Sequence, residues 1–205
     1  MSTSTRGAPA EAVAPEQKRE REIVEAAARL FCERGYLGTS TQQIAEEVGM
    51  LKGSLYHYVR SKADILYRVI EDVHRQFTAC VEEDLAAGGT ADLARIEAFL
   101  NRHLDLLLAN AVACEVYRSS LRHLEPEARC VVLAERTRYE RHVTDMIEQA
   151  QTTGEARSDL PASLLATLCL VLVNRAAAGG TDHEPEVVKR AVASLLHRGL
   201  VPGLP

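Results

Sequence analysis

The sequence has no excess of positive charge and few aromatic residues. It holds 24 Lys and Arg against 29 Asp and Glu, for a formal net charge of −5, and it has no Trp and only three Phe. This balance excludes a protein that coats nucleic acid with a generally basic surface, so any DNA contact must come from a small local site. With 205 residues and 46% hydrophobic content, the chain is nevertheless long and apolar enough to fold.

Cysteine clusters and metal-binding motifs are also missing. The five cysteines are odd in number, lie far apart and form no CxxC motif, and the seven histidines include no HxxxH or HExxH motif. We therefore expect no disulfide framework, no metal site and no cofactor. An all-α enzyme that uses a buried Cys or His is a remote alternative, because no nucleophile–base pair supports it. The cysteines are Cys32, Cys80, Cys114, Cys130 and Cys169.

No apolar run is long enough to cross a membrane. The longest nearly continuous stretch, Leu160 to Val173, is interrupted by Pro161, Ser163 and Thr167 and is shorter than the roughly 18 residues that a membrane span needs. The N-terminus shows no charged-then-apolar signal pattern. These features predict a soluble protein of the reducing cytoplasm.

Apolar residues recur at helical spacing through most of the chain. In the first such segment Ile23, Ala27 and Leu30 share one face, and Gly35 stands where a left-handed cap would end the helix. Residues 1–15 are small and polar, which predicts a flexible arm. No stretch alternates apolar and polar residues for long enough to be a strand. The sequence therefore predicts an all-α fold of about nine helices, near 16–34, 41–48, 51–59, 62–87, 91–109, 111–124, 126–151, 161–178 and 185–198.

Two short helices joined by a tight turn stand near the N-terminus. Ser40-x-x-Gln43 is a capping box that opens the first of them, and Gly49 forces the turn. The residues that can pack the pair against the preceding helix are Ile44, Ala45, Val48 and Leu55. This arrangement predicts a helix-turn-helix. The outer face of its second helix carries hydrogen-bond donors suited to phosphates or base edges, namely Lys52, Ser54, Tyr56 and His57.

A longer motif runs through the same segment. Its positions are Gly35, Thr39, Ser40, Ile44, Ala45, Gly49, Gly53, Ser54, Leu55, Tyr56, Tyr58 and Lys62. On these residues the chain resembles the TetR family of transcriptional regulators over roughly 17–77. The resemblance implies a DNA-binding domain over 16–77 and a ligand-binding and dimerisation domain over 78–205. Leu51 stands where the family often has a small polar residue, so the second helix loses a local N-terminal cap.

The resemblance also implies a role at the DNA for individual side chains. Thr41 and Tyr56 would hold phosphates, Lys62 would add a charged phosphate contact, and Gly53 would let the backbone approach the DNA closely. Gln43 could instead be occupied by the capping box. The candidates for base edges are Gln42, Lys52, Ser54 and His57.

The charge is unevenly distributed between the two parts of the chain. Residues 1–62 hold nine Lys and Arg against eight Glu, a net charge of +1, whereas the remainder carries −6. With so few phosphates neutralised by one subunit, useful affinity should need a homodimer on adjacent half-sites of a palindromic DNA operator. In the segment 161–178, apolar residues surround the helix almost completely, which requires burial on both sides. We expect this helix and the one over 185–198 to form an intersubunit four-helix bundle.

The resemblance places a small-molecule pocket among the middle helices, at about 65–178. Polar residues in otherwise apolar stretches could orient a ligand there: Asn101, His103, Tyr117, Tyr139 and Asn174. Because aromatic residues are few, an aliphatic or acyl-type ligand is easier to house than a flat cationic drug, and the reader segment from Gly53 to Tyr58 is similar to regulators of lipid and acyl-CoA breakdown. We expect a repressor released by its ligand. A ligand that acts as a co-repressor, or a protein partner in its place, is the alternative.

Overall fold

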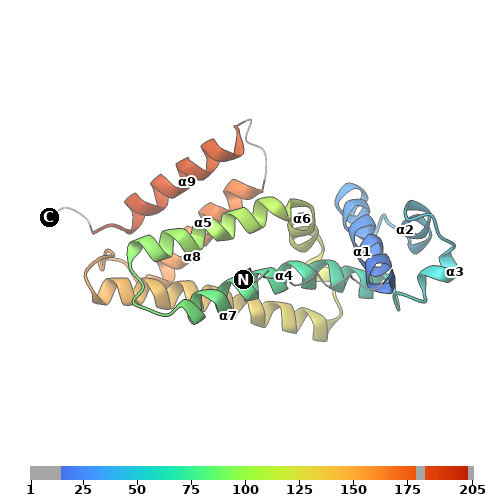
Figure 1. The fold of residues 1–205 in the computed structure, drawn as a ribbon, viewed down its shortest axis with the longest axis horizontal. Helices are drawn as coiled ribbons and strands as arrows, with labels where there is room; N and C mark the ends of the chain where they lie inside the picture. Colours follow the sequence, from blue (N-terminus) through green and yellow to red (C-terminus); the bar gives the residue numbers. More distant parts are fainter. Residues whose placement is uncertain (1–14, 179–182, 203–205) are drawn as a thin grey trace, which may run out of the picture.

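The computed structural model describes residues 15–178 and 183–202. Within these ranges the chain forms nine α-helices, one 3₁₀ helix and no strand (Figure 1), which confirms the all-α fold. The arm expected over 1–15 lies outside the described residues, apart from Pro15. The helices are α1 (Pro15–Arg34), α2 (Thr41–Glu47), α3 (Lys52–Leu55), α4 (Lys62–Ala87), α5 (Leu93–Ala109), α6 (Ala111–Ser120), η1 (Leu121–His123), α7 (Pro126–Thr152), α8 (Ala162–Ala177) and α9 (Pro185–Leu200).

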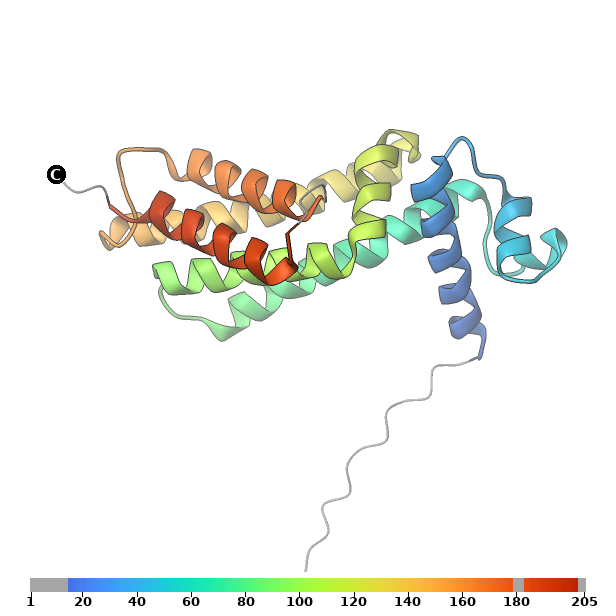
Figure 2. The same ribbon diagram turned by 90° about the horizontal axis from the view of Figure 1, so that it is seen from above.

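The molecule is elongated, and α1, α2 and α3 lie together at one end (Figures 1 and 2). The long helix α4 runs from this end into a bundle with α5, α7, α8 and α9. The short helix α6 lies between the two parts and packs on both α1 and α4. Helices α4 and α6 therefore connect the bundle directly to the small helical end.

Two N-terminal caps set the helix boundaries at this end. The Ser40 hydroxyl accepts a hydrogen bond from the Gln43 amide at 3.2 Å, and the Gln43 side chain accepts one from the Ser40 amide at 2.8 Å. This reciprocal pair confirms the capping box predicted for α2. The N-terminus of α4 is capped by Ser61, whose hydroxyl accepts a hydrogen bond from the Asp64 amide at 3.0 Å.

Helix α3 is shorter than the predicted segment 51–59. Its N-cap residue, Leu51, makes no side-chain cap hydrogen bond, and Gly53 adds a residue of low helix propensity inside the first turn. After Leu55 the backbone tightens, because the amides of His57 and Tyr58 bind carbonyls three residues back. The predicted second helix of the pair is thus a single helical turn followed by a tight turn.

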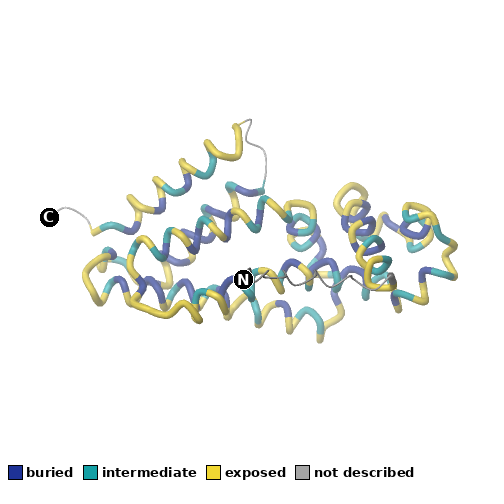
Figure 3. Tube along the Cα trace, viewed as in Figure 1, coloured by how far each residue is buried: buried dark blue, intermediate teal, exposed yellow. Residues whose placement is uncertain are grey.

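Buried and exposed residues alternate along the helices (Figure 3), and the buried side chains form two clusters that divide along α4. The first cluster ends on α4 at Ile70 and contains the apolar faces of α1, α2 and α3. The second begins on α4 at Val73 and contains residues of α5 and of α7 to α9. Three residues from later in the chain complete the first cluster: Val116, Leu124 and Val132. The N-terminal core is therefore closed by α6 and α7 and does not stand alone.

Helix α8 has one buried and one exposed apolar face. Leu165, Cys169 and Val173 point into the second core, whereas Leu164, Leu168 and Val171 are 43–58% exposed. Leu195 on α9 is also exposed, and α8 packs against α9. One apolar face of α8 is thus buried by the described part of the chain, and the other apolar face stays exposed to solvent. No helix in the described part of the chain is long and apolar enough to cross a membrane.

Replacement of Gly38 should damage the fold through a direct backbone clash. A Cβ atom at this position would clash with the backbone carbonyl oxygen of Arg34, at the end of α1. Gly38→Ala should lower the free energy of unfolding by about 1–3 kcal/mol, because backbone atoms must move to relieve the clash. Urea denaturation followed by circular dichroism measures this loss, and a midpoint equal to that of the parent protein would contradict it.

Candidate nucleic-acid interface and ligand cavity

The helix-turn-helix rests on a fully buried apolar support. Ile44, Ala45 and Leu55 have no exposed surface, and they pack α2 and α3 onto α1. The turn between the helices is held from α1 by Arg19, whose guanidinium donates to the Val48 carbonyl at 2.7 Å. The outer faces of α2 and α3 are therefore presented by a rigid base.

The structure brings the two expected phosphate ligands together. The hydroxyl oxygens of Thr41 and Tyr56 lie 3.2 Å apart on the exposed face. Gln42, next to them, donates from its side-chain amide to the Glu46 carboxylate at 2.7 Å. An adenine contact by Gln42 must therefore exchange or share this hydrogen bond.

Most of the donors expected on α3 are free to meet a partner. Lys52, Tyr56 and His57 are exposed, and Ser54 is half-buried. Among the described residues neither Lys52 nor His57 makes an ion pair or a side-chain hydrogen bond. Gly53 is also exposed, and a Cβ atom there would meet no heavy atom within 4 Å. The fold itself does not require a glycine at this position.

Lys62 has a role inside the protein that the sequence did not reveal. Its ammonium donates to the carbonyls of Tyr36 at 3.0 Å and Thr39 at 2.8 Å, and it lies 4.4 Å from the centre of the Tyr36 ring. The expected phosphate contact is left with one N–H donor of three. The observed bonds instead tie the start of α4 to the loop that precedes α2.

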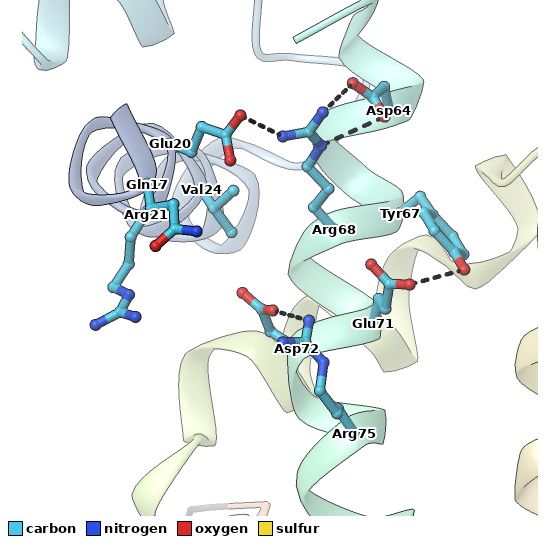
Figure 4. Close-up of a pocket in the computed structure, with 10 residues that line it drawn as sticks. All are labelled: Gln17, Glu20, Arg21, Val24, Asp64, Tyr67, Arg68, Glu71, Asp72 and Arg75. Atoms are coloured by element: carbon cyan, nitrogen blue, oxygen red, sulfur yellow. Dashed lines mark hydrogen bonds and ion pairs between the residues drawn. The ribbon is translucent and has the colours of Figure 1, made fainter. Parts of the chain in front are cut away.

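A polar groove of about 420 Å³ separates α1 from α4, and charged side chains bridge it (Figure 4). Arg68 lies between two acids, 3.2 Å from the Asp64 carboxylate and 3.7 Å from that of Glu20. Each such partly exposed pair contributes only about 0.3–1 kcal/mol. The Arg68–Glu20 pair links α4 to α1, whereas Arg68 and Asp64 both belong to α4.

A second hollow of about 480 Å³ lies among α4, α5, α6, α7 and α8. Four of the five predicted ligand-binding residues line it: His103, Tyr117, Tyr139 and Asn174. The fifth, Asn101, does not, because it is two residues from His103 on α5 and therefore faces about 200° away. The apolar part of the wall is formed by Val73, Phe77, Leu107, Ala166, Leu170 and Val171. We call this hollow the bundle cavity.

His103 and Tyr139 form a buried polar pair in the wall of the bundle cavity. His103 Nδ1 lies 2.8 Å from the Tyr139 hydroxyl, and the rings of Phe77 and His103 are 4.9 Å apart. Burial lowers the pKa of His103 to about 4, so the imidazole is neutral at neutral pH. Two buried polar atoms in this region have no hydrogen-bond partner among the described residues: His103 Nε2 and the Tyr117 hydroxyl.

The charged residues of the cavity wall are paired with one another or with neighbours. Arg118 lies 2.7 Å from Glu115, and Arg136 lies 2.7 Å from Glu140. His74 faces Glu135 at 3.5 Å, and burial lowers the pKa of His74. The sequence analysis missed these cavity residues; the i, i+3, i+4 spacing of Arg136, Tyr139 and Glu140 on one face of α7 was the available signal.

The buried cysteines are poor nucleophiles. Burial raises the pKa of Cys114, which lines the cavity, and that of Cys169 to about 11 in each case. Among the described residues no group of three or more His, Cys, Asp or Glu is placed to hold a metal ion. The cavity thus offers a binding wall with polar groups and no activated thiol.

Family models match both parts of the chain. The model described as "Bacterial regulatory proteins, tetR family" matches residues 23–69, and the one described as "Tetracyclin repressor-like, C-terminal domain" matches residues 89–200. The chain belongs to the TetR family. It is therefore a DNA-binding transcriptional regulator, with its reader in the helix-turn-helix described above.

Similar proteins cover most of the chain. The HTH-type transcriptional repressor KstR2 of Rhodococcus jostii is 29% identical over 161 residues, which are 76% of this chain and 76% of that protein. The structure of PfmR, a TetR family regulator from Thermus thermophilus, has a TM-score of 0.77 at 28% identity and covers 86% of this chain and 97% of its own. The structure of AibR in complex with isovaleryl coenzyme A and operator DNA has a TM-score of 0.76 at 26% identity, over 87% and 98% of the two chains. These proteins are regulators, which favours gene control over the enzyme considered above.

The buried imidazole of His103 should make stability depend on pH. Below the ordinary His pKa of about 6.5 the unfolded chain takes up a proton that the folded protein refuses until about pH 4, so stability falls as the pH drops through this window. His103→Gln should remove up to about 3 kcal/mol of this fall. Urea titrations at several pH values measure it. Above pH 7 the two proteins should show parallel pH dependence, and parallel curves between pH 4 and 6.5 would contradict the prediction.

Proposed function

We propose that this protein is a homodimeric repressor that leaves a palindromic operator when a small ligand occupies the bundle cavity. The observation that carries the proposal is the exposed face formed by α3 and the turn that follows it. Among the described residues, Lys52 and His57 on this face have no ion-pair or side-chain hydrogen-bond partner, the fold does not require Gly53, and the base beneath is fully buried. Such a face is suited to the major groove of DNA. The protein acts in the cytoplasm, where the DNA of a bacterial regulator lies.

The proposed DNA contacts divide into positioning and reading groups. Thr41 and Tyr56 hold phosphates through their adjacent hydroxyls, and the backbone at Gly53 approaches a phosphate closely. The proposed base-reading side chains are Gln42, Lys52, Ser54 and His57. Lys62 acts indirectly, because its bonds to the loop carbonyls fix where α2 begins.

The exposed apolar face of α8 supports the proposed dimer. Leu164, Leu168 and Val171 on α8 and Leu195 on the adjacent α9 are left exposed by the part of the chain that the structure describes. A second copy that covers both helices would bury them in a symmetric four-helix contact. Two reading helices could then enter successive major grooves, about 34–36 Å apart or somewhat more.

Helix α6 supports the proposed coupling between the cavity and the DNA reader. Its residues Cys114 and Tyr117 line the bundle cavity, whereas Val116 is buried in the N-terminal core. Directly after α6, the ring of His123 stacks on that of Tyr36 at 5.2 Å, in the loop that Lys62 holds. A ligand that favours another position of α6 would therefore shift the population of reader orientations.

The cavity wall favours an aliphatic, acyl-type ligand. Its apolar residues are mostly aliphatic, with Phe77 as its one phenylalanine. AibR, which is similar to this chain in fold and sequence, is described in complex with isovaleryl coenzyme A. A ligand that strengthens DNA binding would make the protein a co-repressor-dependent regulator, and the direction of the effect on DNA affinity distinguishes the two.

Gly53→Ala provides a test that separates DNA binding from folding. The added methyl group has open space in the protein and favours a helix, so stability should stay equal or rise by up to about 1 kcal/mol. It should hinder the approach of the backbone to DNA and weaken operator binding about tenfold. Electrophoretic titration with DNA from upstream of the gene measures this effect. Lack of sequence preference in the parent protein at physiological salt would overturn the proposed function, and unchanged affinity of the variant would overturn the role of Gly53.

His123→Ala provides a test of the coupling route. Loss of the stack on Tyr36 should reduce, by several-fold, the factor by which octanoyl coenzyme A lowers operator affinity, while the affinity of DNA-free protein for this probe stays the same. Calorimetry and DNA titration with and without the probe give both numbers. Glu127→Gln, at an exposed position near the start of α7 and outside the stack, is the control. An unchanged release factor in His123→Ala would exclude this route.

A further inference from the structure

The bundle cavity contains a buried hydrogen-bonding group that the protein leaves unused. His103 is 6% exposed and lines the cavity, yet its Nε2 atom has no partner among the described residues. A buried polar atom without a hydrogen bond is costly, and such an atom in a cavity wall marks a place where a ligand can supply the partner. The chemistry of this atom and of its surroundings therefore restricts the ligand.

Hydrogen bonding to Tyr139 determines whether Nε2 donates or accepts. If Nδ1 donated its proton to Tyr139, both the phenolic hydrogen and the Nε2 lone pair would be left without partners. If the Tyr139 hydroxyl donates to Nδ1 at the observed 2.8 Å, only one atom remains unsatisfied, and it is Nε2–H. The second arrangement satisfies more groups, so the unused atom is a donor on a neutral ring.

The cavity wall offers no spare positive charge. Arg118 and Arg136 are held by the carboxylates of Glu115 and Glu140 at 2.7 Å, and the wall adds one further acid, Glu135. A carboxylate ligand brought beside His103 would lose its water and meet an uncharged donor. An uncharged carbonyl oxygen needs only the hydrogen bond, so its desolvation on entering the cavity costs far less free energy than that of a carboxylate.

We propose that the bundle cavity selects an aliphatic ligand with an uncharged carbonyl, as in a thioester or a ketone, and discriminates against the corresponding free carboxylate. The carbonyl oxygen accepts the hydrogen bond from His103 Nε2–H, and the chain packs on Phe77, Leu107 and Leu170. The inference rests on the proposed function only in treating this cavity as the effector site. Binding itself does not depend on what the DNA reader does.

Three probes that share the same octanoyl group separate the carbonyl types. They are octanoate, S-octanoyl-N-acetylcysteamine, which is a thioester without a nucleotide, and 2-nonanone. Calorimetry on DNA-free protein at pH 7.5 should show that at least one uncharged probe binds ten times or more tightly than octanoate. Comparison of the thioester with the ketone identifies which source of the carbonyl the site prefers. Octanoate binding as tightly as both uncharged probes, or no binding of any probe at 1 mM, would overturn the proposal.

Variants on opposite faces of α5 test the role of His103. His103→Phe keeps the bulk of the ring and should weaken binding of the preferred uncharged probe about tenfold, whereas His103→Gln keeps an N–H donor and should recover most of the affinity. Asn101→Ala, which alters the face turned away from the cavity, should bind as the parent does. Thermal unfolding checks that each variant is folded. Parental affinity in folded His103→Phe would remove His103 from the site.

Operator titration with the same probes keeps the two hypotheses apart. Uncharged probes that bind to the cavity without changing operator affinity would refute ligand-controlled release and leave the selectivity of the cavity standing. Octanoate that binds best and releases DNA would refute the selectivity and leave the repressor function standing.

Discussion

The passage of α4 through both cores is the constraint on which the rest of the structure depends. Residues up to Ile70 belong to the core beneath the DNA reader, and those from Val73 belong to the core around the bundle cavity. A shift of α4 along or across its axis therefore changes both at once. Arg68 and Lys62 strengthen this link at the reader end, since one binds acids on α1 and α4 and the other binds the loop before α2. The reader thus moves with the first turns of α4 as one body.

Helix α6 gives this body a second point of support. Helix α6 is short and contributes side chains to both cores. Tyr117 lines the bundle cavity and the adjacent Val116 is buried in the N-terminal core, so a displacement of Tyr117 also displaces Val116. The stack of His123 on Tyr36 extends the contact to the loop that α2 begins from. Packed cores tolerate discrete rearrangements better than continuous deformation, so two alternative positions of α6 are a natural basis for bound and released states.

Local sequence signals predicted most of the fold, but they did not predict the direction in which individual side chains point. Ser40 and Ser61 correctly predicted the starts of two helices, because an N-cap needs only a side-chain hydroxyl that accepts a hydrogen bond from the backbone amide three residues later. Lys62 could not be assigned in the same way, because the carbonyls that it binds lie 23 and 26 residues earlier and meet it only in the folded chain. Asn101 failed for a simpler reason: polarity within an apolar stretch does not say which face of α5 meets the cavity, and His103 lies about 200° round the helix from it. The length of α3 was overestimated because the apolar pattern continued past Leu55 while the backbone tightened into a turn.

The surface that we propose reads DNA also carries acids, and their placement shapes the specificity that a single subunit can achieve. Glu46 accepts the Gln42 amide at 2.7 Å, which orients that side chain before any DNA arrives. This pre-ordering reduces the entropy lost on binding, but the carboxylate repels phosphates and weakens the non-specific attraction that a basic surface would supply. With the base contacts proposed above, such a reader gains little from charge alone and depends on correct alignment of Gln42, Lys52 and His57 with base edges. Since each base contact adds only about 1–3 kcal/mol, two aligned copies reach a useful affinity that one cannot. The exposed apolar face of α8 and the sparse charge of the reader therefore point to the same requirement, a rigidly spaced pair.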